Sequence, residues 1–288
     1  MGRRPREVPL LYRSVRAGQG PGDVRTPARR RGQHMLARHP RGPNRSTAED
    51  LTISRRPFTC LAIETATDLP GVALVRGGVV SQREAHGLRA PSRHVFEWVH
   101  DLLDEARVGL AELDCIAFGA GPGSFTGVRV AVAVAQALGY SRGIALCPVS
   151  SLAALAAVAV RETGATRVAC CLDAHMGEVY AGLYRADDAL GAVALGPDRL
   201  VPPGELGLPA EERWLAAGPG WAAYPDLTTR LAGSLAGIEP ALLPSAVEVA
   251  RLAEPLYRAG RVLPPAEAHP NYLRQRVATP AASTRIPP

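Results

Sequence analysis

The chain has 288 residues and a formal net charge of +6, and 47% of its residues are hydrophobic. It contains no lysine, which excludes a P-loop NTPase, whose lysine binds the phosphates, and any enzyme that forms a lysine Schiff base. No run of 18 uncharged apolar residues occurs, so we expect no transmembrane helix, and no apolar segment follows the basic N-terminus as a secretory signal would require.

The positive charge is concentrated in residues 1–56, which hold 14 Arg and 4 acidic residues, a net charge of +10. Residues 57–288 hold 19 Arg and 23 acidic residues, a net charge of −4. The leading segment is rich in Arg, Gly and Pro and lacks hydrophobic periodicity, so it cannot bury enough apolar surface to fold. We interpret it as a disordered extension; the alternative is a basic arm that contacts RNA.

Residues 58–106 predict a strand, a hairpin and a helix, in that order. Residues 58–67 are apolar enough for a buried strand, and residues 71–85 predict two strands about a tight Gly-Gly turn. In residues 93–106, apolar side chains recur every three or four positions, which indicates an amphipathic helix.

Residues 113–162 continue with alternating strands and helices. Strands are predicted at residues 113–119 and 143–149, and helices begin at Ser124 and Ser150. A hairpin-led group of three strands followed by alternating strands and helices predicts a mixed sheet with helices on its faces.

The second half of the chain repeats this order in a weaker form. Residues 166–196 predict three more strands, the last two joined by a turn at residues 186–188, and residues 213–224 predict another strand, Gly-Pro-Gly turn and helix. The two Gly-Pro-Gly turns lie 97 residues apart, and the acidic strand ends Glu64 and Asp173 lie 109 apart. These offsets predict a duplicated lobe, with coincidence as the alternative.

Four motifs carry a resemblance to a known family. The segments "LAIETAT", "GPGSFTGVRVAVAVAQAL", "LDAHMGEVY" and "AHPNYLR" occur in the order and at the spacing of the TsaB family, also called YeaZ, over residues 58–280. Each motif alone is weakly specific, whereas four in register are highly specific. The sequence departs from the family pattern at two places. The first strand ends in Glu64, where the family has Asp, and the leading extension has no counterpart in the family.

The resemblance implies an α/β protein with the actin-like fold of Hsp70 and sugar kinases, built from two duplicated ribonuclease-H-like lobes. This fold agrees with the order of strands and helices predicted from the sequence. We expect a helix at residues 244–260 and an extended tail from residue 269. The boundaries that we expect are a disordered basic extension at 1–56, an N-terminal lobe with the partner-binding helices at 57–160, a degraded second lobe at 161–278 whose helix 245–260 could pack back on the first, and a flexible tail at 279–288.

The function that the resemblance implies is a part in tRNA modification. TsaB is the bacterial subunit required to place threonylcarbamoyl on adenosine 37 of tRNAs that read ANN codons, giving t6A. The family's member is held to be a non-catalytic dimerisation scaffold for TsaD, which carries the catalytic site, alongside the ATPase TsaE. The resemblance therefore implies a cytoplasmic protein that forms a homodimer or pairs with TsaD, with no cofactor, metal or catalytic residue of its own. tRNA would be contacted indirectly or through residues 1–56.

The turn before the second helix has the residues of a phosphate-binding loop. Gly121 and Gly123 permit a tight strand-to-helix turn, Ser124 can cap the helix, and the helix N-terminus can attract an anion. Together with the strand-end residues Glu64, Thr65 and Asp173, these positions could be a vestigial phosphate site. The alternative, which we favour, is that the glycines allow the loop and helix to pack closely.

The helix that begins at Ser124 is apolar nearly all round, so more than one of its faces must be buried. Its small residues would let another helix approach closely. The alternatives are burial within this chain and burial against a partner. The resemblance favours a partner, because the family pairs through the first two helices of this lobe. The interface residues that we expect are Val95, Trp98, Val99, Leu102, Phe125, Val128, Arg129, Val132, Ala135 and Gln136.

An enzymatic function is the alternative to a scaffold. Acidic residues at the ends of equivalent strands hold Mg²⁺ in actin-fold ATPases, so Glu64 and Asp173 could serve an ATPase or phosphotransferase. The second lobe offers "AAGPGWAAYPD" as its adenosine site, but Trp221 and Tyr224 would fill that space. The histidines have no metal-ligand spacing, and the five cysteines form no CxxC and lie in apolar runs, so we interpret the cysteines as buried residues.

Overall fold

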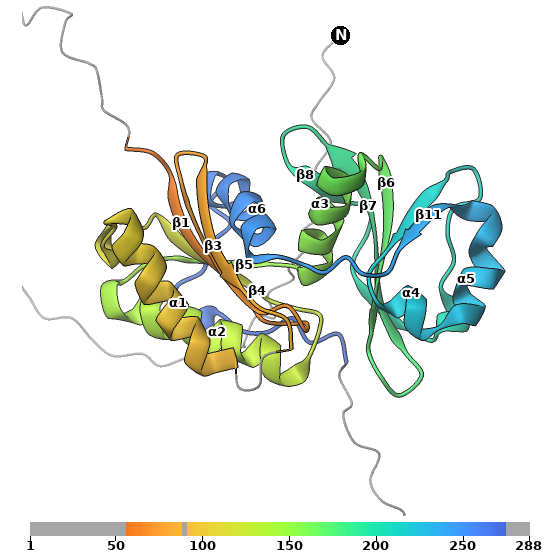
Figure 1. Ribbon diagram of the computed structural model, residues 1–288, viewed down its shortest axis with the longest axis horizontal. Coiled ribbons are helices and arrows are strands. Elements are labelled where there is room, and N and C mark those ends of the chain that lie inside the picture. The colour runs from red at the N-terminus through yellow and green to blue at the C-terminus, as the bar shows by residue number, and fades with distance from the viewer. Residues whose placement is uncertain (1–55, 88–90, 275–288) are drawn as a thin grey trace, which may run out of the picture. The chain divides into compact units, whose positions relative to one another are not determined.

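A computed structural model describes residues 56–87 and 91–274 (Figure 1). Residues 1–55 of the predicted extension and the whole flexible tail predicted at 279–288 lie outside this range. The first elements are β1 (Thr59–Glu64), β2 (Gly71–Arg76), β3 (Val79–Glu84), α1 (Pro91–Ala106), η1 (Leu110–Glu112), β4 (Cys115–Gly119), α2 (Phe125–Arg142), β5 (Leu146–Val149) and α3 (Ser151–Thr163). The others are β6 (Arg167–Asp173), β7 (Val179–Asp187), β8 (Gly191–Ala194), β9 (Arg199–Val201), η2 (Pro203–Glu205), β10 (Trp214–Ala217), α4 (Gly220–Ala223), α5 (Pro225–Leu231), η3 (Ala232–Ser234), β11 (Leu235–Glu239), α6 (Ala246–Arg258) and η4 (Pro265–Glu267).

The strands form two sheets of the same topology. The first sheet has the order β3-β2-β1-β4-β5, in which β1, β2 and β3 are antiparallel and β1, β4 and β5 are parallel. The second sheet repeats this order with β8, β7, β6, β10 and β11 in the corresponding places, and β9 adds to β7. This is the strand order of a ribonuclease-H-like lobe, present twice. The predicted actin-like fold with two duplicated lobes is confirmed.

The elements predicted from the sequence are present, with three differences. The turn between β7 and β8 lies at residues 188–190, not 186–188, because the Asp187 carboxylate accepts hydrogen bonds from the backbone of Ala189 and Leu190 and β7 runs on to Asp187. The helix expected before residue 225 is only the four-residue α4, and α5, which begins at Pro225, was not predicted. Strands β9 and β11 were not predicted, since they are short and lack clear alternation of apolar residues.

The central strands β1 and β4 of the first sheet are buried on both faces, and alternate residues of these strands face opposite sides. In β1, Leu61 and Ile63 belong to the apolar cluster that contains residues of α1 and α2, whereas Cys60 and Ala62 belong to the cluster that contains residues of α3 and α6. The same division holds in β4. This explains the continuous apolar runs in the sequence, which are typical of strands covered on both faces.

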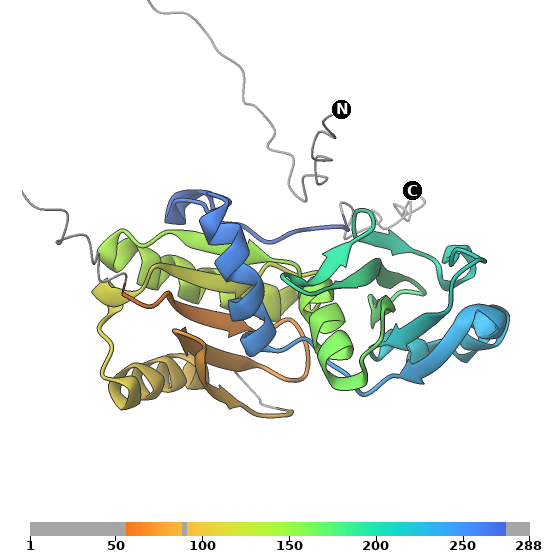
Figure 2. The same ribbon diagram turned by 90° about the horizontal axis from the view of Figure 1, so that it is seen from above.

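A second core lies between the two sheets and contains α3 and α6 (Figure 1, Figure 2). Nine consecutive residues of α3, from Ser151 to Ala159, are buried. They contact β6, β7, β8 and β10, while α6 packs on β1, β2, β4 and β5. The outer face of the second sheet is covered by α4 and α5 around Trp214 and Trp221. The five cysteines are all buried in these layers, as predicted.

Candidate interaction surface

The end of β1 places a carboxylate inside the protein. Glu64 is fully buried; its Oε1 accepts a hydrogen bond from the Ala66 N–H (2.6 Å) and its Oε2 accepts one from the Ser151 hydroxyl (2.8 Å). A side chain at Gly119 would collide with this carboxylate, so the glycine makes the space that Glu64 fills. Burial raises the pKa of Glu64, and the two hydrogen bonds partly oppose the rise.

The glycine-rich loop is packed directly against the end of β1. A Cβ atom on Gly127 would lie 1.9 Å from the Thr65 carbonyl oxygen, and one on Gly123 would lie 2.5 Å from the Ala66 carbonyl oxygen. The Thr65 hydroxyl donates to the Gly127 carbonyl (2.6 Å), and the Ser124 N–H donates to the Ala66 carbonyl (2.7 Å). The glycines therefore allow the loop and the helix to pack closely.

Two further positions of this loop have structural duties. Gly121 has φ +91°, a backbone conformation that glycine adopts without strain. Ser124 is the N-cap of α2 and accepts a hydrogen bond from the Gly127 N–H (3.4 Å). Both residues thus fix the entry to α2.

Asp173 ends β6, the strand that corresponds to β1 in the second sheet. Its Oδ1 accepts hydrogen bonds from the His175 N–H (2.8 Å) and the Tyr224 hydroxyl (3.0 Å), and its Oδ2 lies 3.1 Å from His175 Nδ1. Trp221 is buried and donates to the Ala169 carbonyl (3.0 Å). As predicted, Trp221 and Tyr224 fill the space beside this strand.

The two acidic strand ends are therefore held by groups of this chain. A magnesium site needs carboxylate oxygens that face the metal, whereas both oxygens of Glu64 are buried and hydrogen-bonded. Within residues 56–87 and 91–274, no three His, Cys, Asp or Glu side chains gather closely enough to hold a metal ion. The arrangement fixes the turns after β1 and β6.

An apolar groove lies on the outer side of the helix pair α1 and α2. It has a volume of about 330 Å³, and Phe96 and Phe125 at its sides are 48% and 57% exposed. The groove is lined by Phe96 of α1 and by Phe125, Thr126, Arg129, Val130, Ala133 and Val134 of α2. Exposed large apolar side chains that gather at one place mark a surface for another molecule. We name this feature the α1–α2 groove.

The ten residues predicted for a partner interface divide into three groups: two that line the groove, two that are half-buried and six that are buried. Phe125 and Arg129 line the groove, and Trp98 is half-buried beside His94 at a ring distance of 6.0 Å. Gln136 is half-buried and donates to the carbonyls of Pro265 and Ala268 (2.9 and 3.0 Å). The third group is buried by this chain itself and consists of Val95, Val99, Leu102, Val128, Val132 and Ala135.

The buried group requires a correction. Five of these side chains pack in the core between the helices and the first sheet, and Val128 is buried next to Gly121 of the turn before α2, so none of the six presents a surface to a partner. The regular apolar stripe of an amphipathic helix marks the side that packs on the helix's own sheet. Phe96, Val130 and Ala133 line the groove instead and were not predicted. The signal that could have found Phe96 is a large apolar residue outside the stripe.

Among the described helices, none combines the length and hydropathy needed to cross a membrane.

The comparisons with known proteins match a family model named TsaD and relatives named TsaB or YeaZ. A family model described as "TsaD: tRNA N6-adenosine threonylcarbamoyltransferase" matches residues 76–281. The Escherichia coli K12 protein named tRNA threonylcarbamoyladenosine biosynthesis protein TsaB is 35% identical over 226 residues, 76% of this chain and 95% of the relative. The protein of the same name from Haemophilus influenzae is 29% identical over 233 residues, again 76% and 95% of the two chains. The solved structure of YeaZ from Pseudomonas aeruginosa is 36% identical with a TM-score of 0.68, covering 75% of this chain and all of that one.

Proposed function

Since the chain belongs to the TsaB (YeaZ) family, whose named members are tRNA threonylcarbamoyladenosine biosynthesis proteins, we propose that it is a non-catalytic scaffold in t6A synthesis. In this proposal it binds a TsaD-like catalytic subunit through the α1–α2 groove and keeps that subunit competent for threonylcarbamoyl transfer. The same groove would serve a homodimer in the absence of that partner. The proposed compartment is the cytoplasm, and a TsaE-like ATPase would complete the assembly.

The observation that carries the proposal is the α1–α2 groove. Phe96 and Phe125 expose large apolar surface on a helix pair, whereas the carboxylates at the strand ends are hydrogen-bonded within the chain. Aromatic side chains, phenylalanine among them, are enriched in protein interfaces relative to the rest of the protein surface. A groove beside small residues such as Ala133 suits the close approach of a partner helix.

Ala133→Glu tests the proposal. Ala133 is exposed in the middle of α2, so glutamate fits the helix there but places a charge in the apolar groove. We expect the variant to lose co-purification with the TsaD-like subunit, to sediment as a monomer and to fail to restore t6A in cells that lack the wild-type protein.

Ala222→Glu is the matched control, because Ala222 is also an exposed helical alanine but lies in α4 on the second sheet. Both variants should keep the wild-type melting temperature. If Ala133→Glu were stable and still bound the TsaD-like subunit with unchanged affinity, the groove would not be its docking site.

The alternative function is an ATPase or phosphotransferase that uses Glu64 and Asp173. An actin-fold phosphotransferase needs its carboxylates free to bind Mg²⁺ and to position the nucleophile. Glu64 would have to give up hydrogen bonds to Ala66 and Ser151 to do so.

A further inference from the structure

The segment that follows α6 runs along α2 and ends on the second lobe. Leu263 pairs with Leu146 of β5, and the Asn271 N–H donates to the Ala120 carbonyl (2.8 Å) at the turn before α2. Gln136 of α2 holds the same segment by its two hydrogen bonds to Pro265 and Ala268. We name residues 263–274 the C-terminal strap.

The strap is in contact with the α1–α2 groove. The Arg129 guanidinium lies 3.3 Å from the centre of the Phe125 ring and 5.1 Å from that of Tyr272, so it is held between an aromatic of α2 and one of the strap. Phe125 and Arg129 line the groove. Tyr272, which is 48% exposed, therefore lies next to Arg129 at the side of the groove.

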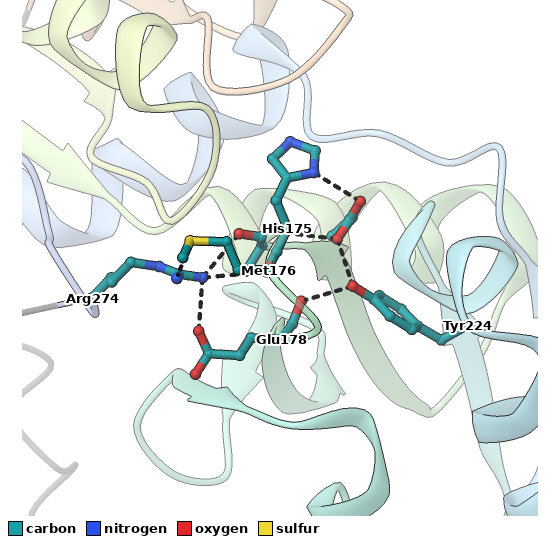
Figure 3. A network of polar contacts seen from close by, with 7 residues as sticks. His175, Met176, Glu178, Tyr224 and Arg274 are labelled. Carbon is teal, nitrogen blue, oxygen red and sulfur yellow. Dashed lines mark hydrogen bonds and ion pairs between the residues drawn. The ribbon is translucent and has the colours of Figure 1, made fainter. Parts of the chain in front are cut away.

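The end of the strap is fixed to the turn after β6 (Figure 3). Arg274 donates to the carbonyls of Ala174 (3.0 Å) and His175 (3.4 Å), pairs with Glu178 (2.8 Å) and contacts the Met176 sulfur (3.1 Å). The strap thus joins α2 to a turn of the second lobe.

That turn holds an exposed methionine in a strained backbone. His175 and Met176 have φ values of +58° and +57°, which are uncommon for residues with a side chain, and Gly177 follows with +77°. Such strain persists only where the surroundings impose it and is concentrated at functional sites. Here Asp173, Tyr224 and Arg274 fix the turn, while the Met176 side chain remains 77% exposed.

A series of contacts runs from the α1–α2 groove through Arg129 and Tyr272 to Arg274 and Met176. Exposed large apolar side chains are concentrated along this series. Eight such residues occur in residues 56–87 and 91–274, and four of them lie on it. Those four are Phe96, Phe125, Tyr272 and Met176. Apolar residues exposed singly need no explanation, whereas a connected group indicates an interaction surface.

We propose that the surface for the protein partner in the α1–α2 groove extends over Arg129 and Tyr272 of the strap region to Met176 of the second lobe. This inference rests on the proposed function for the groove itself. One partner would then contact both lobes at once. The strap would fix the distance between the two halves of its binding surface.

The contacts indicate the chemistry of that partner. Arg129 bonds to the Phe125 carbonyl (3.4 Å) and stacks on two rings, but no described carboxylate pairs with it. A partner that places an aspartate or glutamate at Arg129 would complete this site, with apolar side chains against Tyr272 and Met176. Arg and aromatic residues together are typical of the centre of a protein interface.

Met176→Ala and Tyr272→Ala test the extension, with Ile238→Ala as the matched control. Ile238 is an exposed apolar residue (41%) of the second lobe that lies in the edge strand β11, away from the series of contacts. The affinity of each full-length variant for the TsaD-like subunit is measured by calorimetry, after its melting temperature is compared with that of the wild type. We expect each of the two variants to raise Kd about tenfold and the control to leave it unchanged.

Arg129→Gln supplies a readout that loss of folding would not give. If Arg129 meets a carboxylate, the wild-type Kd rises with salt, and the Arg129→Gln variant loses part of that dependence. A salt dependence equal to that of the wild type would overturn the acidic contact.

The outcomes separate this inference from the proposed function. Wild-type affinity in Met176→Ala and Tyr272→Ala, with binding abolished in Ala133→Glu, would overturn the extension and leave the groove as the docking site. If Met176→Ala and Tyr272→Ala weakened the homodimer but not the complex with the TsaD-like subunit, the assignment of this surface to a different protein would be overturned. Unchanged binding in Ala133→Glu would remove both proposals.

Discussion

At the scale of single residues, Glu64 shows how an acidic strand end can serve the fold. Its carboxylate lies against Gly119 and bonds to one backbone N–H and one hydroxyl. The Ser151 hydroxyl that it accepts from belongs to the first turn of α3. Glu64 therefore links the end of β1 to the helix between the two sheets.

Glu64→Gln should change the pH dependence of stability. Burial raises the pKa of Glu64 in the folded state, so on raising the pH the unfolded chain ionises first and the folded protein loses stability until the raised pKa is passed. Glutamine keeps an acceptor oxygen for the Ala66 N–H, its amide N–H can donate to the Ser151 hydroxyl, which would then accept instead of donate, and it cannot ionise. We expect a melting temperature close to wild type at pH 4 and higher than wild type at pH 8, by about 3 °C for each kcal/mol of relief.

The measurement is thermal unfolding of both proteins from pH 4 to pH 8, with the exposed Glu211→Gln as control. If the melting temperature of Glu64→Gln depended on pH in the same way as that of the wild type, ionisation of the Glu64 carboxyl would not lower the stability of the folded protein.

At the scale of elements, hydrophobic periodicity predicted the strands and helices but not which residues face a partner. The stripe that includes Val95, Val99 and Leu102 was correct evidence for an amphipathic helix, and the structure shows that this stripe packs on the chain's own sheet. Phe96 lies off the stripe, so only the folded pair of helices reveals that it meets Phe125 across a groove. Contacts between distant segments, such as Arg129 with Tyr272, have no local signal.

The glycine at the start of α2 should be far more sensitive to substitution than a glycine in open space. Gly127→Ala would place a methyl group against the Thr65 carbonyl and force α2 away from the end of β1. We expect a loss of about 3 kcal/mol in the free energy of unfolding. Gly233→Ala, in η3 with no atom near its Cβ position, should change stability little.

Urea unfolding followed by circular dichroism at 222 nm measures both variants. If Gly127→Ala were as stable as Gly233→Ala, the close packing of the loop on β1 would not contribute to the free energy of unfolding.

At the scale of the whole molecule, the two lobes share a hydrophobic core. Residues of both sheets meet around α3 and α6, with Cys60 and Ala62 from the first sheet and Val168, Cys170 and Tyr184 from the second in one cluster. Polar contacts add to it, since Ser150 at the start of α3 donates to Asp198 (2.6 Å), which also accepts from Tyr184 (2.5 Å). A shared core of this kind opposes independent motion or unfolding of either lobe.

The two lobes should therefore unfold in one transition. Trp214 and Trp221 are buried in the second lobe and Trp98 lies on α1, so a Trp98→Phe variant has tryptophan fluorescence from the second lobe alone. We expect its fluorescence and its circular dichroism to give the same melting temperature, because α3 cannot lose its contacts with one sheet without exposing the core that it shares with the other. Leu155→Ala in α3 should lower both midpoints together, with a loss of about 3 kcal/mol. Two separate midpoints in Trp98→Phe would instead show that each sheet folds with its own helices and that the core around α3 and α6 does not couple them, in which case a partner could bind one lobe without stabilising the other.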